Sequence, residues 1–265
     1  MSSPEIAAVL PSSLDVVLEG EVALIRLNRA EKRNALDDRT VLGLQAFFAA
    51  IPDGVKAVIL YGAGDHFSAG LDLSQLTERD ATEGVGHSMM WHRAFERIQF
   101  GKVPVIAVLH GAVVGGGLEL ACAAHIRIAE PSAFFALPEG QRGIFVGGGG
   151  SVRIPRLIGV ARMMDMMLTG RVYRAEEGHR IGLAQYLVED GQGLATARAL
   201  AARIAGNAPL TNFAVMHALP RIADADPGIG FMTEALMAAV AQGDNEAKTR
   251  LRDFLEKRAA KVGEG

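Results

Sequence analysis

Two glutamates lie in apolar surroundings that suit general acid/base chemistry. Glu119 sits within Leu-Glu-Leu-Ala-Cys-Ala-Ala, at the start of an apolar helix-like segment, and Glu139 follows Leu-Pro at the end of a short apolar run. Burial disfavours an ionised carboxylate and raises its pKa toward neutrality, where it can exchange protons. Both are therefore candidates for an acid/base pair. The alternatives are a structural ion pair of Glu119, for example with Arg142, and a helix-start role for Glu139.

Two segments of small residues directly follow predicted strands and can supply backbone donors. Residues 66–73 read His-Phe-Ser-Ala-Gly-Leu-Asp-Leu, and residues 110–119 contain three consecutive glycines before Leu-Glu. Glycine lets the backbone approach a ligand closely, and a helix N-terminus offers unpaired N–H groups. Two such turns can together polarise one carbonyl oxygen, an arrangement in which one donor is worth roughly 3–4 kcal/mol. A plain tight turn is the alternative for the triple glycine.

Other catalytic signatures are absent from the sequence. It contains no Gly-x-x-x-x-Gly-Lys-[Ser/Thr] loop, no Gly-x-Ser-x-Gly elbow and no His-Glu-x-x-His, and its seven histidines are scattered. The single cysteine, Cys122, cannot form an intrachain disulfide, and its apolar neighbours indicate a buried, inert thiol. We therefore expect no metal site.

Composition and charge narrow the classes of partner. The chain has 265 residues, of which 49% are hydrophobic and 22% charged, as in ordinary globular proteins, and its net charge of -3 gives no reason to expect nucleic acid. The beginning, Met-Ser-Ser-Pro-Glu, does not resemble a signal peptide. The apolar stretch 103–124 contains His110, Glu119 and a run of three glycines at 115–117, which favours a strand, turn and helix over a membrane span. A cytoplasmic protein without a membrane partner is expected.

The elements that must position these residues alternate between strands and helices. Apolar patterns predict a hairpin over 15–19 and 22–27, strands over 55–61, 103–110, 126–129, 133–136 and 184–188, and helices over 38–50, 85–98 and 117–124. This alternation indicates an α/β fold with parallel strands. Only helices follow, over 192–206, 209–222, 229–242 and 245–261. We expect an α/β core over residues 1–205 and a helical C-terminal region over residues 206–265 that takes part in oligomer packing.

Taken in order, these segments resemble the crotonase (enoyl-CoA hydratase/isomerase) family over nearly the whole chain. The motifs that carry the resemblance lie at residues 27–36, 67–73, 105–120, 137–150, 155–159, 168–171, 182–183 and 254–258. Each motif is modest alone, but their order and spacing are specific. The resemblance implies the crotonase-type spiral of ββα units followed by a helical C-terminal region, and a role in fatty acid metabolism.

The resemblance assigns chemistry to four residues. It implies that the N–H groups of Leu71 and Gly116 form an oxyanion hole for a thioester carbonyl and for the enolate that develops from it. Glu119 then helps to activate the water that attacks Cβ, and Glu139 delivers a proton to Cα. Two glutamates at these positions are typical of the family's hydratases, whereas its isomerases often lack one. The implied enzyme is an enoyl-CoA hydratase, a hydro-lyase; an isomerase, hydrolase or lyase of the same fold and a non-catalytic acyl-CoA-binding subunit are the alternatives.

The resemblance also implies where coenzyme A binds, as part of the substrate and with no separate cofactor. The residues implied to contact it are Lys32, Arg33, Ala35, Ala69, Gly70, Leu71, Asp72, Leu73, Gly116 and, from a neighbouring subunit, Lys257. For the basic side chains a solvated surface role is the alternative. Members of the family form trimers, often paired as hexamers, so a homotrimer or homohexamer is expected.

One departure from the family pattern concerns the acyl pocket. Val146 stands where the family usually has proline, within residues 143–150, and the resemblance implies that this segment lines the acyl pocket near Glu139. The sequence therefore leaves the acyl-chain preference open. Met163, Met164, Met166 and Met167 lie nearby at helical spacing, which is typical of core filling.

Overall fold

The computed structural model describes residues 10–75 and 78–256. The chain divides into two compact units, Met1–Ala202 and Arg203–Gly265, and the division falls within helix α8 (Gly193–Ala205). The fold is mixed α/β with a helical C-terminal region, as the sequence predicts.

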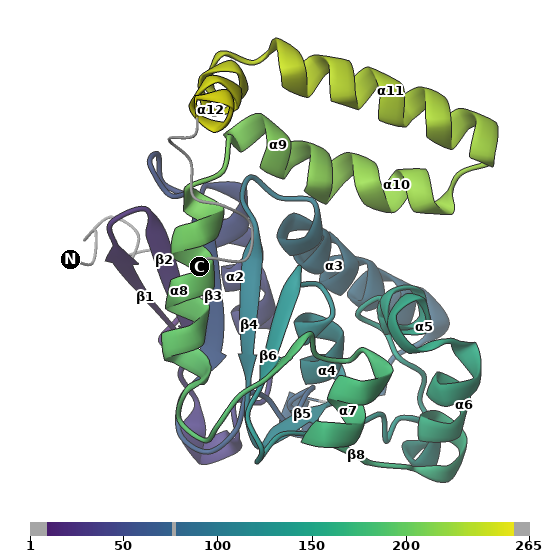
Figure 1. Cartoon of the computed structure of the whole chain (residues 1–265). Coiled ribbons are helices and arrows are strands. Elements are labelled where there is room, and N and C mark those ends of the chain that lie inside the picture. The colour runs from purple at the N-terminus through teal and green to yellow at the C-terminus, as the bar shows by residue number, and fades with distance from the viewer. Residues whose placement is uncertain (1–9, 76–77, 257–265) are drawn as a thin grey trace. The chain divides into compact units, whose positions relative to one another are not determined.

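The first unit is built on a six-stranded sheet with the order β1-β2-β3-β4-β6-β9 (Figure 1). β1 (Leu14–Glu19) pairs antiparallel with β2 (Val22–Leu27), which confirms the predicted hairpin. The other neighbours pair in parallel, and these strands are β3 (Ala57–Gly62), β4 (Val105–Leu109), β6 (Ile126–Ala129) and β9 (Tyr186–Leu187). β4 is buried at every position, as expected for a parallel strand that is covered on both faces.

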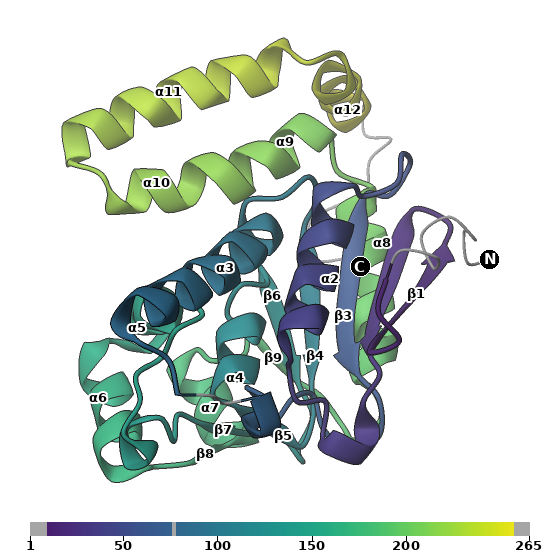
Figure 2. The same cartoon turned by 180° about the vertical axis from the view of Figure 1, so that it is seen from behind.

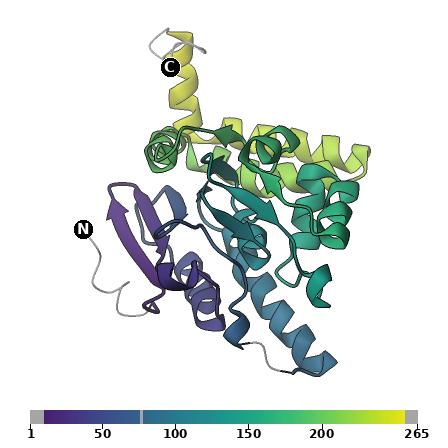
Figure 3. The same ribbon diagram turned by 90° about the horizontal axis from the view of Figure 1, so that it is seen from below.

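Helices cover both faces of this sheet. α2 (Asp38–Ala49) and α3 (Ala81–Gln99) lie on one face and the first part of α8 lies on the other, as the opposite views of Figure 1 and Figure 2 and the view from below in Figure 3 agree. α2 begins where predicted, because the Asp37 carboxylate accepts a hydrogen bond from the Thr40 N–H. α3 begins four residues earlier than predicted, because Asp80 and Glu83 form a capping box.

A small second sheet joins β5 (Ala112–Val114), β7 (Phe134–Ala136) and β8 (Tyr173–Arg174). The sequence pattern did not separate β5 from β4, because one apolar run supplies both. The chain turns between them at Gly111, where φ is +52° and a Cβ would lie only 2.0 Å from the Asp65 carbonyl oxygen. That run therefore serves two sheets and brings the triple glycine beside the 66–73 segment.

Four short helices follow in the first unit. α4 (Gly116–Ala121) carries Glu119, and α5 (Gly150–Ile158), α6 (Val160–Thr169) and α7 (Ala175–Ile181) were not predicted. In α6, Met163 and Met166 are buried, which confirms their predicted place in the core, whereas Met164 is 53% exposed and the prediction for it is wrong. Met167 is partly buried against the core.

The second unit contains α9 (Pro209–Phe213), a π-helical turn (Ala214–Ala218), α10 (Leu219–Asp224), α11 (Pro227–Gly243) and α12 (Asn245–Leu255). In α11 the only buried residue is Gly230, and large apolar side chains are exposed along it: Ile229, Phe231, Met232, Leu236 and Val240. None of the helices in the part of the chain that the structure describes has the length and apolarity needed to cross a bilayer.

Asn34 connects the turn after β2 to the loop after β3. It is 2% exposed and has a left-handed backbone with φ +53°. Its Oδ1 accepts from the Arg29 N–H at 2.9 Å, and its Nδ2 donates to the carbonyls of Ala63 (2.8 Å) and His66 (2.7 Å). This amide therefore fixes the start of the 66–73 segment.

We expect Asn34→Ala to lower the free energy of unfolding by about 2–4 kcal/mol, because it removes three hydrogen bonds of a buried side chain and because alanine tolerates a positive φ less well than asparagine. Urea titration followed by circular dichroism measures this. The control is Asn207→Ala, at an exposed position, which should change stability by no more than about 0.5 kcal/mol. Equal effects of the two variants would contradict the assigned role of Asn34.

Candidate active site

The 66–73 segment is held between β5 and the turn after β2. The Ser68 N–H donates to the Ala112 carbonyl at 2.9 Å, and the Val114 N–H donates to the Ser68 carbonyl at 3.1 Å. On the other side, the Leu36 N–H donates to the Gly70 carbonyl at 2.7 Å, and the Asp72 N–H donates to the Leu36 carbonyl at 2.8 Å. The backbone is therefore fixed on both sides of Leu71.

The two predicted donor turns approach each other closely at Gly70 and Gly116. Gly70 has φ +88°, and a Cβ there would lie 2.5 Å from the Val114 carbonyl oxygen and 3.1 Å from the Gly116 nitrogen. A Cβ at Gly116 would lie 3.5 Å from the Leu71 nitrogen. Among the described residues, neither the Leu71 N–H nor the Gly116 N–H has a hydrogen-bond acceptor. Two unpaired amides thus lie side by side, as an oxyanion hole requires.

Glu119 lies in the first turn of α4 and is 3% exposed. Its Oε1 accepts hydrogen bonds from the Gly148 N–H at 2.8 Å and the Gly150 N–H at 2.7 Å. Burial raises the pKa of Glu119, and these amide donors oppose that rise. No ion pair between described residues joins Glu119 to Arg142, so the structure does not support the structural alternative.

Glu139 follows β7 and precedes a 3-10 turn, Gly140–Arg142. Glu139 occupies the N-cap position of that turn, in keeping with the helix-start alternative, but its side chain makes no capping hydrogen bond there. It is 7% exposed, and its Oε2 is buried without a hydrogen-bond partner among the described residues. Burial, with a smaller contribution from the charge of Glu119, raises the pKa of Glu139 to about 7. Glu139 is therefore suited to hold a proton at neutral pH.

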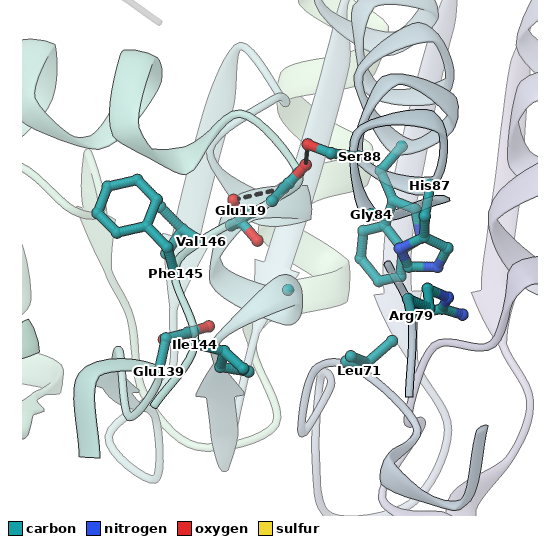
Figure 4. Close-up of a pocket in the computed structure, with 14 residues that line it drawn as sticks. Leu71, Arg79, Gly84, His87, Ser88, Glu119, Glu139, Ile144, Phe145 and Val146 are labelled. Carbon is teal, nitrogen blue, oxygen red and sulfur yellow. Dashed lines mark hydrogen bonds between the residues drawn. The ribbon is translucent and has the colours of Figure 1, made fainter. Parts of the chain in front are cut away.

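Both carboxylates line one cavity of about 440 Å³ (Figure 4). Glu119 and Glu139 lie on one side of it, with His87 and Arg79 across from them in the view of Figure 4. The sequence did not single out five further lining residues, which come from the approach to α3 and from α3 itself: Arg79, Gly84, His87, Ser88 and Trp91. Ile144, Phe145, Gly147 and Gly148 also line the cavity, and they belong to the segment 143–150 that was expected to lie beside Glu139. Leu71, Gly116 and Val146 complete the lining.

The α3 wall of the cavity is fixed by contacts of its polar and aromatic side chains. His87 Nε2 is hydrogen-bonded to Asp38 Oδ1 at 2.8 Å, and the Ser88 hydroxyl donates to the Gly147 carbonyl at 2.7 Å. A Cβ at Gly116 would lie 2.8 Å from the Trp91 ring, so glycine there makes room for the indole. The Trp91 side chain thereby closes the cavity beside the unpaired amide of Gly116.

Most of the residues predicted to contact coenzyme A line a second cavity, of about 420 Å³. It is lined by Glu31, Lys32, Arg33, Ala35, Ala69, Leu71, Asp72, Leu73, Ser74 and Arg142. Leu71 lines both cavities, so the two lie next to each other at this residue. Gly70 and Gly116 lie at the junction of the two turns instead, and Lys257 lies outside the described residues.

Asp72 acts within the protein at the edge of this second cavity. Its carboxylate accepts from the Ser74 hydroxyl at 2.7 Å, from Arg29 Nη2 at 2.7 Å and from Lys32 Nζ at 3.3 Å. The Ser74 hydrogen bond, with those of the two cations, holds the pKa of Asp72 well below its usual range. The carboxylate is thus occupied in orienting Lys32, and Arg29 is a positioning residue that sequence reasoning missed.

Cys122 is buried at the end of α4, as predicted. Burial raises the pKa of its thiol to about 11, which leaves it protonated and unreactive at neutral pH. Over the described residues, no group of three or more histidine, cysteine or acidic side chains is placed to hold a metal ion.

The chain matches known proteins along nearly all of its length. It is 35% identical to the short-chain-enoyl-CoA hydratase of Clostridium acetobutylicum, covering 91% of this chain and 93% of the relative. It is 31% identical to the crotonyl-CoA hydratase of Syntrophomonas wolfei, covering 93% and 96%. The folds agree as well: a Rhodopseudomonas palustris protein of known crystal structure is 63% identical with a TM-score of 0.92 (95% and 98% covered), and an enoyl-CoA hydratase from Bacillus anthracis is 30% identical with a TM-score of 0.86 (92% and 96% covered). The enoyl-CoA hydratase/isomerase family profile matches residues 18–264, and the chain belongs to that family.

Proposed function

We propose that this protein adds water across the α,β double bond of an enoyl-CoA thioester. The observation that carries this proposal is the single cavity that contains two buried carboxylates with different hydrogen bonding beside two unpaired backbone amides. The relatives named short-chain-enoyl-CoA hydratase and crotonyl-CoA hydratase support a thioester with a short acyl chain.

The reaction begins with the thioester carbonyl. Its oxygen accepts hydrogen bonds from the N–H groups of Leu71 and Gly116, which draws electron density away from Cβ. Water attacks Cβ while Glu119 takes one of its protons, and the electron pair of the double bond moves to form an enolate on that oxygen. Glu139 then gives its proton to Cα, and the carbonyl reforms. One water is consumed. Glu119 has gained one proton and Glu139 has lost one, so the two carboxyl groups together hold as many protons as before.

The two glutamates differ in a way that suits these assignments. Glu119 receives two N–H bonds on one oxygen, which stabilises the anion that a general base needs. Glu139 has a buried oxygen without a donor, which favours the protonated form that a general acid needs. We therefore assign Glu119 as the base and Glu139 as the acid.

The second cavity is the proposed site for the coenzyme A portion of the substrate. Lys32 and Arg33 offer cations to its phosphates, and the small residues Ala35 and Ala69 leave room for the pantetheine. Completion of the site by Lys257 of a neighbouring subunit, in a homotrimer or homohexamer, is part of the proposal. The exposed apolar side chains of α11 support an assembly of that kind.

Replacing either carboxylate should abolish most of the activity. We expect Glu119→Gln and Glu139→Gln each to lower the rate by at least about 100-fold, because each removes one proton-transfer group. Loss of the enone-thioester absorbance of crotonyl-CoA measures the rate. Glu176→Gln, at an exposed acidic residue of α7, is the matched control and should react like the wild type. Wild-type rates for both active-site variants would show that the assigned roles are wrong.

Gly70→Ala should disrupt the oxyanion hole. The new Cβ would meet the Val114 carbonyl and the Gly116 nitrogen, so we expect a loss of roughly 100- to 1,000-fold in kcat. The control is Gly54→Ala, because Gly54 also has a left-handed φ, +85°, but no atom lies within 4 Å of the added Cβ. It should cost only about 1–2 kcal/mol in stability and leave kcat unchanged. A folded Gly70→Ala variant with wild-type kcat would remove the case for this oxyanion hole.

Glu139 should also make the stability depend on pH. Its pKa in the folded protein is about 7 against an ordinary value of 4.5, so the folded state holds this proton more tightly than the unfolded chain. The contribution is complete below pH 4.5 and is lost as the pH rises through 7. Glu139→Gln cannot ionise, so its stability relative to the wild type should increase by about 3 kcal/mol between pH 4.5 and 8. Urea unfolding across this range tests the prediction, and a constant difference between the two proteins would contradict it.

A further inference from the structure

We propose that Arg153 is a positioning residue for the general base: it holds the glycine turn 147–150 in the conformation that donates two N–H bonds to Glu119. Arg153 lies in α5 and does not line the cavity. This inference rests on the proposed function, because it concerns the carboxylate assigned there as the base.

The hydrogen bonds form a chain from α3 to Glu119. Arg153 Nε donates to Gln99 Oε1 at 2.7 Å, at the end of α3, and Arg153 Nη1 donates to the Gly148 carbonyl at 2.9 Å. The N–H of the same glycine donates to Glu119 Oε1 at 2.8 Å. Gly148 is therefore fixed on one side by the guanidinium and on the other by the carboxylate.

The turn is packed too tightly to hold this conformation with larger residues. A Cβ at Gly149, where φ is +91°, would lie 2.3 Å from Arg153 Nη1. A Cβ at Gly150 would lie 2.8 Å from Glu119 Oε1, and one at Gly148 would lie 3.2 Å from Glu119 Oε2. Only the backbone of the turn separates the Arg153 guanidinium from the Glu119 carboxylate. A displacement of Arg153 therefore moves the N–H groups that donate to Glu119.

Arg153 is 7% exposed, and no carboxylate of the described residues forms an ion pair with it. A buried guanidinium is costly unless polar groups compensate it. The Gln99 and Gly148 oxygens do so directly, and Glu119 does so across the turn. In return, the positive charge of Arg153 lowers the pKa of Glu119, in opposition to the effect of burial.

Other ionisable groups surround this pair. Glu139 shares the cavity with Glu119 and has its own pKa raised to about 7. The Cys122 thiol is neutral at pH 7, since its pKa is about 11. Glu96 of α3 acts on Arg153, and the buried guanidinium of Arg127 acts on Cys122. Arg153 is the cation among these that acts on Glu119.

Arg127 provides a matched comparison within the same unit. It is 2% exposed, and like Arg153 its guanidinium bonds to oxygens that carry no formal charge: Nε donates to the Leu183 carbonyl at 2.9 Å and Nη1 to the Ala124 carbonyl at 2.6 Å. It makes no hydrogen bond to the 147–150 turn. Arg127→Met therefore reproduces the loss of a buried arginine without loss of support for Glu119.

The experiment compares Arg153→Met, Arg153→Lys and Arg127→Met in hydration of crotonyl-CoA, with kcat, KM and the pH profile of kcat/KM measured for each full-length protein. We expect Arg153→Met to lower kcat about 10- to 100-fold with little change in KM. The acid limb of its profile should move up by roughly one pH unit, because Glu119 loses the cation that favours its anion. Arg153→Lys keeps the positive charge but not the two hydrogen-bonding positions of the guanidinium. Its acid limb should therefore lie closer to that of the wild type than its kcat does.

Arg127→Met should lose stability while kcat stays within about threefold of wild type and the acid limb is unmoved. The proposal is overturned if Arg153→Met behaves like Arg127→Met. Should Arg153→Met fail to fold, Gln99→Leu removes the Nε anchor alone. It should lower kcat severalfold without a change in KM, and wild-type kcat would overturn the proposal.

A measurement without turnover separates this proposal from the proposed function. In protein labelled with carbon-13 at glutamate side-chain carboxyls, the signal lost in Glu119→Gln identifies Glu119, and its titration midpoint should rise in Arg153→Met. An inactive wild type with this rise intact would refute the hydratase assignment alone. An active wild type with an unchanged midpoint and unchanged kcat in Arg153→Met would refute the positioning role alone.

Discussion

The cost of keeping two carboxyl groups out of water governs this site. Neither Glu119 nor Glu139 has a cationic partner in direct contact among the described residues. Burial raises the pKa of both, and the backbone donors around them account for much of the difference between them. Two N–H groups on one oxygen favour a charge on Glu119, and the absence of such donors at Glu139 Oε2 favours a proton there. The two glutamates therefore differ in the proton state that their surroundings favour, although their side chains are identical.

The fold supplies these turns at one place because two parallel segments are bonded to each other. β5 and the 66–73 segment exchange backbone hydrogen bonds, which places the amide of Leu71 beside that of Gly116. The Asn34 amide and the Arg29–Asp72 ion pair fix the same segment from the side of the β2–α2 turn. The two unpaired amides that are proposed as the oxyanion hole thus lie together because of sheet pairing combined with glycine at the points of closest approach.

The features that could be predicted from the sequence are those with a local signal in the chain. Glu119 and Glu139 were identified from apolar neighbours, and the donor turns from small residues after strands. It could not find the α3 wall of the cavity, because the contact between Ser88 and Gly147 spans 59 positions and exists only in the folded chain. The same holds for Gln99 and Arg153, which are 54 positions apart. The early start of α3 had a local signal, the Asp80–Glu83 pair, and short elements such as β8 had none, since two residues show no periodicity.

The hydrogen bond from Ser88 to the Gly147 carbonyl has a consequence for substrate size. It connects α3, which borders the cavity, to Gly147, the first residue of the 147–150 turn that donates hydrogen bonds to Glu119. If the acyl group occupies this cavity, as proposed, a group too bulky for it would displace α3, and the Ser88 hydroxyl would pass that displacement to the turn and to Glu119. Chain-length discrimination would then affect kcat more than KM.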